Sequence, residues 1–413
     1  MSDIDKKIRE ADRFARNGVA VQSMMYASMR AKKNKIAVLS PGGFSDNSKY
    51  IFAFLSNNIK KYRDDCEVFW LAHSAGEADL LNSFGVEAIH FKYDGPVLQK
   101  LIESKVCLRS THHLGRVDYC MLQASLVGAT NIQMWHGIPA KKVAYQLLKN
   151  RKNAWDFAYF AADCLANDYA IAESEYVAPR YQEAFPNASL LISGSPRTDM
   201  LFGDTPDNPL LYLNTNFSVL QSMMDFREQG GRVALYCPTF REAGQDRTSF
   251  LEGIRAFLTL TAKDPDIMVV VKNHRVSKDE DAIREIVNGL GSSRILMPAA
   301  ADDIYPYMRE TSVLVTDYSS SYYDFLLTGR DVVFFQPDRE EYTDKRPIYD
   351  EEALSGFSLG PKTADGEAAY RAIKEEQSGD LKVNQETVCS KLFAHRDGKS
   401  CERLAEKIFN DLY

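Results

Sequence analysis

The chain has 413 residues, 45% of them hydrophobic and 11% aromatic, so it is long and apolar enough for two cores rather than one. Its 57 acidic and 50 basic residues give a net charge of −7, which argues against a nucleic acid as partner. The seven cysteines form no CxxC pair, which argues against a disulfide framework or zinc site and for a reducing compartment.

Residues 1–34 are interpreted as a helical leader with a basic bias. Its start is charged where a signal peptide would have an apolar core, and no run in the sequence approaches the roughly 20 apolar residues that span a bilayer. We therefore expect a soluble or peripheral protein.

From residue 35 onward, short β-branched or aromatic runs alternate with helical stretches such as Ser48–Lys61 and Asp118–Val127. This alternation predicts α/β units with parallel sheets covered on both faces. The strands expected in the first half are Lys35–Ser40, Glu67–Leu71, Glu87–Phe91, Val106–Arg109, Asn131–Trp135, Phe157–Ala161 and Leu190–Ser193. Those expected in the second half are Arg232–Cys237, Ile267–Lys272, Arg294–Met297, Ser312–Thr316 and Asp331–Gln336.

The stretch Gly203–Pro209 is rich in Pro, Asp and Asn and divides the two series of strands. We predict a first domain over residues 35–205 and a second over residues 206–413, which includes the closing C-terminal helix. Two Rossmann-like, doubly wound domains that face a central cleft are the simplest arrangement.

A hydroxyl-rich turn follows the strand that ends at Thr316. Ser321 and Asp324 have the spacing of a capping box, so the turn at Ser319 and Ser320 is expected to present backbone N–H groups at a helix N-terminus. Such a turn is a seat for phosphate. The alternative is a serine-rich helix cap without a ligand.

Cationic and titratable residues follow another strand, at Lys272–Arg275. An ammonium, an imidazole and a guanidinium together suit a diphosphate. The alternative is that His274 makes only a local hydrogen bond.

His136 stands between Trp135 and Gly137, at the end of a strand and before Pro139. An exposed imidazole on a stiff turn is a candidate general base, although the Gly and Pro also fit a purely structural turn. His112 and His113 have no third ligand at useful spacing, so no metal site is expected.

Taken together, these segments resemble the CDP-glycerol glycerophosphotransferase family, the teichoic-acid primases and polymerases with relatives in capsule synthesis. The matching segments, in order, are Ser45–Lys49, Trp135–Pro139, Gly194–Asp199, Pro238–Arg241, Lys272–His274, Thr316–Ser320, Asp338–Tyr342 and Asp397–Arg403. The resemblance implies a GT-B fold with the acceptor side first and the nucleotide side second. It implies transfer of glycerol phosphate from CDP-glycerol to a hydroxyl of a lipid-linked or growing glycopolymer, with release of CMP and no cofactor beyond the donor substrate.

The resemblance also assigns roles to individual residues. His136 resembles the catalytic base, and His274 is expected to act with it while contacting the pyrophosphate. The expected donor-binding residues are Thr239, Arg241, Lys272, Asp317, Ser319, Ser320, Asp338, Tyr342 and Arg346. The expected acceptor-side residues are Asp46, Asn47, Lys49 and Arg197.

Three positions depart from the family pattern, namely Ile138, Arg275 and Pro337. They leave a CDP-ribitol or other polyol donor open. The rival readings are a GT-B glycosyltransferase that uses a nucleotide sugar and a nucleotide-binding scaffold without activity.

A basic stretch, Lys141–Lys152, follows the His136 turn. Its cations and apolar residues are typical of an interfacial helix or of an ordinary amphipathic helix. With a lipid-linked acceptor, the first reading places a cytoplasmic protein peripherally at the inner face of the membrane.

Overall fold

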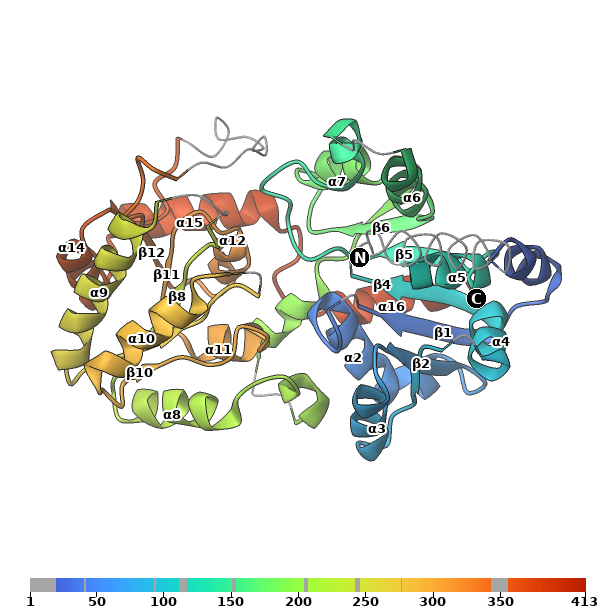
Figure 1. Cartoon of the computed structure of the whole chain (residues 1–413), viewed down its shortest axis with the longest axis horizontal. Coiled ribbons are helices and arrows are strands. Elements are labelled where there is room, and N and C mark those ends of the chain that lie inside the picture. Colours follow the sequence, from blue (N-terminus) through green and yellow to red (C-terminus); the bar gives the residue numbers. More distant parts are fainter. Residues whose placement is uncertain are drawn as a thin grey trace, which may run out of the picture. The chain divides into compact units, whose positions relative to one another are not determined.

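The computed structural model describes residues 20–40, 42–92, 94–110, 117–150, 154–203, 207–241, 246–275, 277–342 and 356–413. The chain divides into two compact units (Figure 1). The first comprises Met1–Gly137, Lys142–Arg197 and Lys399–Tyr413, and the second comprises Ile138–Lys141 and Thr198–Gly398.

The first unit is built on a seven-stranded sheet with the order β3-β2-β1-β4-β5-β6-β7, in which all neighbours pair in parallel. Its strands are β1 (Lys33–Leu39), β2 (Glu67–Ala72), β3 (Ala88–His90), β4 (Ser104–Arg109), β5 (Thr130–Gln133), β6 (Tyr169–Ala172) and β7 (Ser189–Ile192). Its helices are one over residues 20–29, α2 (Asp46–Tyr62), α3 (Ala75–Ser83), α4 (Gly95–Glu103), α5 (Val117–Ser125), η1 (Ala144–Asn150), α6 (Ala154–Leu165), α7 (Ala178–Ala184) and α16 (Ser400–Asp411).

Both faces of this sheet are buried, as in other parallel sheets covered by helices. Alternate residues of β1 and β2, including Ala37, Leu39, Phe69 and Leu71, enter one core. On the opposite face Trp70 is fully buried, and its ring packs edge-on against Phe44 at 4.8 Å between centroids.

The second unit is built on a six-stranded parallel sheet with the order β10-β9-β8-β11-β12-β13. Its strands are β8 (Arg232–Cys237), β9 (Ile267–Val271), β10 (Ile295–Leu296), β11 (Val313–Thr316), β12 (Asp331–Phe335) and β13 (Lys362–Thr363). Its helices are η3 (Pro209–Tyr212), α8 (Phe217–Glu228), α9 (Thr248–Lys263), α10 (Glu280–Leu290), α11 (Tyr305–Glu310), α12 (Ser321–Leu326), α14 (Gly366–Lys374) and α15 (Gly379–Leu392). The 3₁₀ helix η2 (Pro196–Leu201) straddles the boundary between the units.

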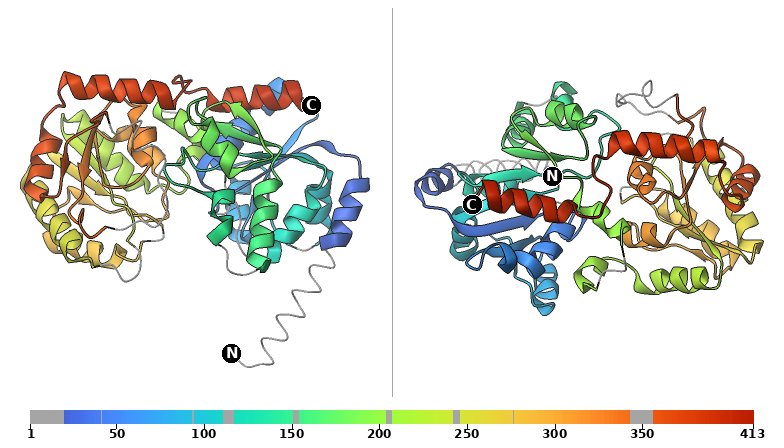
Figure 2. Two further views of the ribbon diagram at one scale, coloured as in Figure 1. Left: turned by 90° about the horizontal axis from the view of Figure 1, so that it is seen from above. Right: turned by 180° about the vertical axis from the view of Figure 1, so that it is seen from behind.

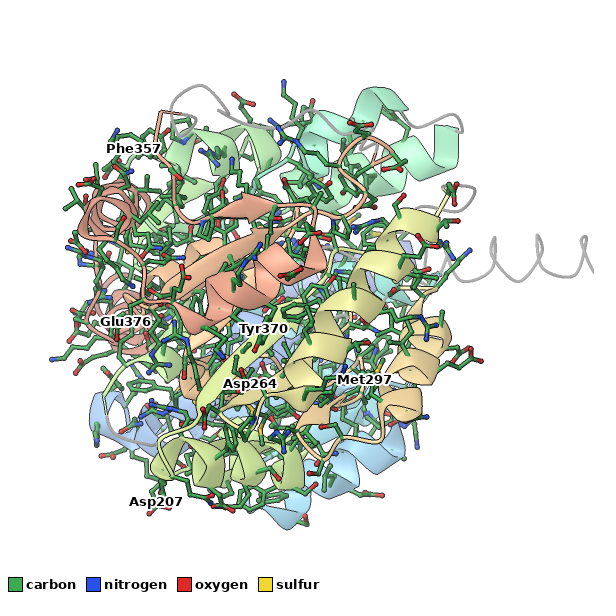
Figure 3. The ribbon with its side chains drawn as sticks, turned by 90° about the vertical axis from the view of Figure 1, so that its left-hand side faces the viewer. Asp207, Asp264, Met297, Phe357, Tyr370 and Glu376 are labelled. Carbon is green, nitrogen blue, oxygen red and sulfur yellow. The ribbon has the colours of Figure 1, made fainter. Side chains whose placement is uncertain are left out.

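Helices α9 and α14 pack on the same core as the centre of this sheet, with Phe257, Ile373, Val269 and Val315 among the buried residues. Figure 3 shows Tyr370 of α14 beside Asp264, which directly follows α9. The Tyr370 hydroxyl donates to Asp264 Oδ2 at 2.8 Å, so a hydrogen bond joins the C-terminal end of α9 to the middle of α14.

The two parallel α/β sheets are confirmed, and their described strands begin within two residues of the expected positions, with one exception. Phe157–Ala161 was expected to be a strand but lies within α6, and the strand at this place is β6. The reason is a helical periodicity in which Phe160, Asp163 and Cys164, spaced i, i+3 and i+4, are all buried. The short strand β13 was not expected at all.

The observed units differ from the expected domains at the C-terminus. The last helix was assigned to the second domain, but α16 belongs to the first unit while α15 belongs to the second (Figure 2). Within the first unit, Phe409 stacks on Tyr62 of α2 at 5.1 Å between ring centroids, and Arg403 donates to the Ser193 carbonyl at 3.1 Å. These contacts hold α16 to the first sheet.

The predicted domain boundary and the predicted helical leader agree only in part with the structure. The unit boundary falls between Arg197 and Thr198, a little before the expected residue 205, and residues 204–206 of the predicted break lie outside the described part. Of the expected helical leader, residues 20–29 are helical and residues 1–19 are not described. The facing arrangement of the two domains stays a prediction.

Candidate functional site

The carboxyl end of β8 is the switch point of the second sheet. β8 pairs with β9 on one side and with β11 on the other, so successive strands run away from it in opposite directions. Ligands of open α/β sheets bind at such a point. The segments that leave it are Pro238–Arg241 after β8 and Asp317–Ser320 after β11.

Asp317 joins these two segments. Its carboxylate accepts hydrogen bonds from the backbone N–H of Thr239 at 2.9 Å and from the Thr239 hydroxyl at 2.6 Å. It also pairs with Arg241 at 2.9 Å. Thr239 and Asp317 therefore set the shape of the turn after β8, and Asp317 is almost fully buried.

Arg241 lies inside the fold and is only 2% exposed. Besides Asp317 it binds Asp338, with Nε to Oδ2 at 2.5 Å and Nη2 to Oδ1 at 2.9 Å. Burial alone would lower the pKa of this guanidinium, but the hydrogen bond to Asp338 and the charge of Asp317 raise it. Arg241 thus links the loops after β8, β11 and β12. Because its side chain is buried, it acts on the expected donor pocket by fixing these loops.

Two tyrosines form a stacked pair beside this ion network. The rings of Tyr318 and Tyr342 lie 3.7 Å apart between centroids and 8° from parallel, and Arg241 lies over the Tyr342 ring at 4.9 Å. Burial and the charge of Asp338 raise the pKa of Tyr318. Arg346, the last expected donor residue, lies outside the described residues.

Lys272 and His274 follow β9 but have different surroundings. The Lys272 ammonium is buried and donates to the carbonyls of Ala300 at 2.8 Å and Asn273 at 3.2 Å. Burial lowers the pKa of Lys272. His274 is exposed, with its ring 5.2 Å from that of Phe240. Of these two expected donor residues, only His274 is exposed to solvent.

The serine turn after β11 is present, but the expected capping box is not formed. Ser320 is the N-cap of α12 without a side-chain cap, and the Oγ of Ser319 accepts from the backbone N–H of Ser321 at 3.2 Å. Asp324 is buried and accepts from the Tyr305 hydroxyl at 2.5 Å instead. Ser319 is half-buried and Ser320 exposed, so both hydroxyls lie at the surface of the switch point.

In the first unit, His136 lies on a turn with unusual backbone geometry. The residue is exposed, and its ring stacks on Trp135 at 4.1 Å between centroids. Trp135 has φ of 49° and Gly137 has φ of 101°, so the candidate base stands between two left-handed residues. A side chain at Gly137 would collide with the Arg197 guanidinium, since its Cβ would lie 1.8 Å from Nη2.

The expected acceptor-side residues gather at this turn. Asn47 is fully buried and donates to the carbonyls of Met134 at 2.9 Å and Trp135 at 3.1 Å. Its Oδ1 accepts from the backbone N–H of Arg197 at 3.0 Å. Asp46 pairs with Arg197 at 2.9 Å, whereas Lys49 is fully buried in α2, which places its side chain inside the fold.

Gln133 also shapes this turn, and its role was not expected from the sequence. It is fully buried at the end of β5, and its Oε1 accepts from the Trp135 N–H at 3.0 Å. A polar residue at the last position of a buried strand is the only signal that would have indicated it.

The basic stretch after the turn is only partly described. Residues Ala144–Asn150 form a 3₁₀ helix in which Leu148 is buried and Tyr145 is 38% exposed. Arg151 and Lys152 lie outside the described residues. Across the part of the chain that the structure describes, no helix has the length and apolar character of a membrane span. Within the same residues, no three His, Cys, Asp or Glu side chains are grouped as metal ligands.

The chain is similar to a family of glycerophosphotransferases and to proteins of teichoic acid synthesis. The model of the CDP-Glycerol:Poly(glycerophosphate) glycerophosphotransferase family matches residues 21–410. The teichoic acid poly(glycerol phosphate) polymerase of Bacillus subtilis (strain 168) is 23% identical over 417 residues, which cover 94% of this chain and 50% of the polymerase. The chain thus spans about half the length of that relative.

Two further relatives extend the comparison. The teichoic acid ribitol-phosphate primase of Bacillus spizizenii (strain ATCC 23059 / NRRL B-14472 / W23) is 26% identical over 288 residues, covering 67% of this chain and 68% of the primase. The solved structure of the wall teichoic acid polymerase TagF superposes with a TM-score of 0.66 at 18% identity, covering 100% of this chain and 98% of that one. This last likeness shows a shared fold.

Proposed function

Because the chain belongs to the CDP-glycerol:poly(glycerophosphate) glycerophosphotransferase family, we propose that it transfers glycerol phosphate from CDP-glycerol to a hydroxyl of a cell-envelope glycopolymer. The observation that carries the proposal is the family match across residues 21–410. The switch point of the second sheet supports it, because it offers an imidazole and two hydroxyls where open α/β sheets bind phosphorylated ligands.

The proposed reaction is a single in-line displacement. An acceptor hydroxyl attacks the phosphorus that carries the glycerol, and the bond from that phosphorus to the bridging oxygen breaks. CMP leaves with the electron pair of that bond, and the hydroxyl proton passes to Nδ1 or Nε2 of His136. The product is a phosphodiester between the acceptor and glycerol.

The residues of the second unit hold the donor in this proposal. His274, Ser319 and Ser320 donate hydrogen bonds to the pyrophosphate, which favours the charge that develops on CMP. Arg241, Asp317 and Asp338 act by fixing the loops that carry them, since their side chains are buried. The stacked Tyr318 and Tyr342 form the wall of the donor pocket.

Ribitol phosphate is the second candidate for the transferred group. The ribitol-phosphate primase of B. spizizenii matches this chain at 26% identity, slightly above the poly(glycerol phosphate) polymerase of B. subtilis at 23%. The chemistry at phosphorus is the same for both polyols, so the residues proposed to hold the pyrophosphate do not distinguish the two donors.

The acceptor and the location follow from the same proposal. A lipid-linked saccharide or a growing teichoic-acid or capsular polymer places the reaction at the cytoplasmic face of the membrane, where the protein binds peripherally. We propose that the reaction needs no cofactor besides the CDP-activated donor. Activity that is retained in the presence of a metal chelator would support this proposal, and loss of activity would contradict it.

One assay tests donor and reaction together. The purified protein is incubated with CDP-glycerol, CDP-ribitol or UDP-sugars and candidate acceptors, and the released nucleotide is identified. CMP release that depends on the acceptor supports the proposal, and the preferred donor decides between glycerol and ribitol. Release of a nucleoside diphosphate from a nucleotide sugar would instead establish a glycosyltransferase, and binding without turnover of any donor would favour a scaffold.

A further inference from the structure

Backbone strain in the first unit is concentrated around His136. Among the described residues, four that are not glycine have a left-handed φ, and two of them are Trp135 at 49° and Asp46 at 61°. Left-handed backbone is unfavourable for residues with a side chain, above all for bulky ones. Such a conformation persists only where the surrounding structure enforces it.

The carboxamide of Asn47 contacts both the strained turn at Trp135 and the segment that carries Arg197. It donates to the carbonyls of Met134 and Trp135 at 2.9 and 3.1 Å and accepts from the Arg197 N–H at 3.0 Å. The side chain is fully buried, so water does not replace these bonds. One residue at the start of α2 thereby ties the turn after β5 to the segment after β7.

We infer that Asn47 is the positioning residue for His136, and that its two N–H donors hold the left-handed turn on which the imidazole is presented. The inference rests on the proposed role of His136 as the base. Because the His136 ring stacks on Trp135, a rotation of the Trp135 peptide moves the imidazole with it. Asn47 itself touches no reacting atom.

The chemistry of the site calls for an amide at this position. Asp would keep the acceptor for the Arg197 N–H but would place a carboxylate oxygen against two carbonyl oxygens. Ser would be too short to bridge two carbonyls and an N–H together. Asn supplies two donors and one acceptor from one planar group, which is the combination that the three backbone partners need.

The near-isosteric variant Asn47→Asp tests the inference, because it removes the donors and changes little volume. We expect kcat for CMP release to fall about 100-fold, as for a base displaced by about 1 Å, with the KM for the CDP donor unchanged. We also expect the His136 ring signals to shift in histidine NMR spectra, in which His136→Ala identifies them. Asn131→Asp is the matched control, since Asn131 is also buried and donates to a carbonyl, that of Ala129, at 3.0 Å.

The inference is supported if Asn47→Asp lowers kcat and shifts the His136 signals while Asn131→Asp does neither. It is overturned if the His136 signals stay unchanged, or if Asn131→Asp has equal effects, which would indicate general destabilisation. If the wild-type protein transfers from no CDP-polyol, the proposed function fails, and the NMR comparison still decides whether Asn47 positions the ring.

Discussion

Arg241 and Asp338 form a two-point ion pair inside the second unit, with Nε to Oδ2 at 2.5 Å and Nη2 to Oδ1 at 2.9 Å. Their side chains are 0% and 2% exposed. The pair lies in the loops that follow β8 and β12, and Arg241 also forms an ion pair with Asp317 at 2.9 Å. Its function is thus to fix the geometry of the loops that face the ligand.

Replacing Arg241 with Met should strongly destabilise the protein. The variant leaves the carboxylates of Asp317 and Asp338 buried without their cation, and breaking a buried pair in this way costs about 3–5 kcal/mol. The free energy of unfolding in urea measures the effect. Arg371→Ala is the control, because its pair with Glu367 is more than half exposed and contributes about 0–1 kcal/mol. Equal losses in the two variants would contradict the assignment of Arg241 to a structural network.

Removing the imidazole of His136 should abolish transfer but not donor binding. A general base acts in the transition state, and its loss typically lowers the rate by about 100- to 10,000-fold. His136 lies in the first unit and the donor residues in the second, so calorimetry with a CDP ligand should give nearly the wild-type affinity for His136→Ala. Near wild-type CMP release by this variant would remove His136 from the mechanism.

Removing His274 or the Ser319 hydroxyl should weaken donor binding as well as turnover. Both groups are expected to hold the pyrophosphate in the ground state, so each loss acts on the donor complex and on the transition state. Calorimetry with a CDP ligand measures the first effect and CMP release the second. His395→Ala is the control, because His395 is a partly exposed histidine of the same unit outside the switch point. Unchanged affinity in both test variants would mean that the phosphate seat lies elsewhere.

The sequence was informative where a local pattern decides the structure. The alternation of apolar strands and amphipathic helices predicted the two parallel sheets, because burial on both faces imposes apolar strands. The prediction of a strand at Phe157–Ala161 was wrong because a short aromatic run fits a strand or a buried helix equally well. Only the contacts of Phe160 and Cys164 with the interior decide for the helix.

For the candidate site, the sequence indicated which polar residues follow the strands but not which of their side chains are buried. Arg241 and Lys272 are cations after strands and fit an anion site, yet both are buried. The partners that neutralise Arg241 lie 97 residues away at Asp338 and in the loop after β11 at Asp317. Such distant pairings leave no pattern in a single sequence. The bond from Gln133 to the Trp135 N–H likewise depends on a turn whose φ is set by tertiary contacts.

The stability of the first unit should depend on pH through Glu103, the last residue of α4. Hydrogen bonds from Lys33 and Lys35, at 2.7 and 3.0 Å, lower the pKa of Glu103 to about 2, although burial opposes the shift. The pKa of an unfolded Glu is about 4.3. The stabilising contribution is therefore present above pH ~4.3 and is lost as the pH falls towards 2. Lys33 is 59% exposed, so solvent screening limits the contribution to about 1 kcal/mol.

Glu103→Gln tests this dependence, because it removes the charge and keeps the size of the side chain. We expect the difference in the free energy of unfolding between wild type and variant to be about 1 kcal/mol at neutral pH and to shrink steadily below pH ~4. The difference should also shrink in high salt, which screens charges near the surface. Glu367→Gln provides the comparison, since Glu367 is 63% exposed and pairs with Arg371 one helical turn away. A difference for Glu103→Gln that stays constant from neutral pH to pH ~3 would show that packing, and not the two lysines, makes Glu103 stabilising.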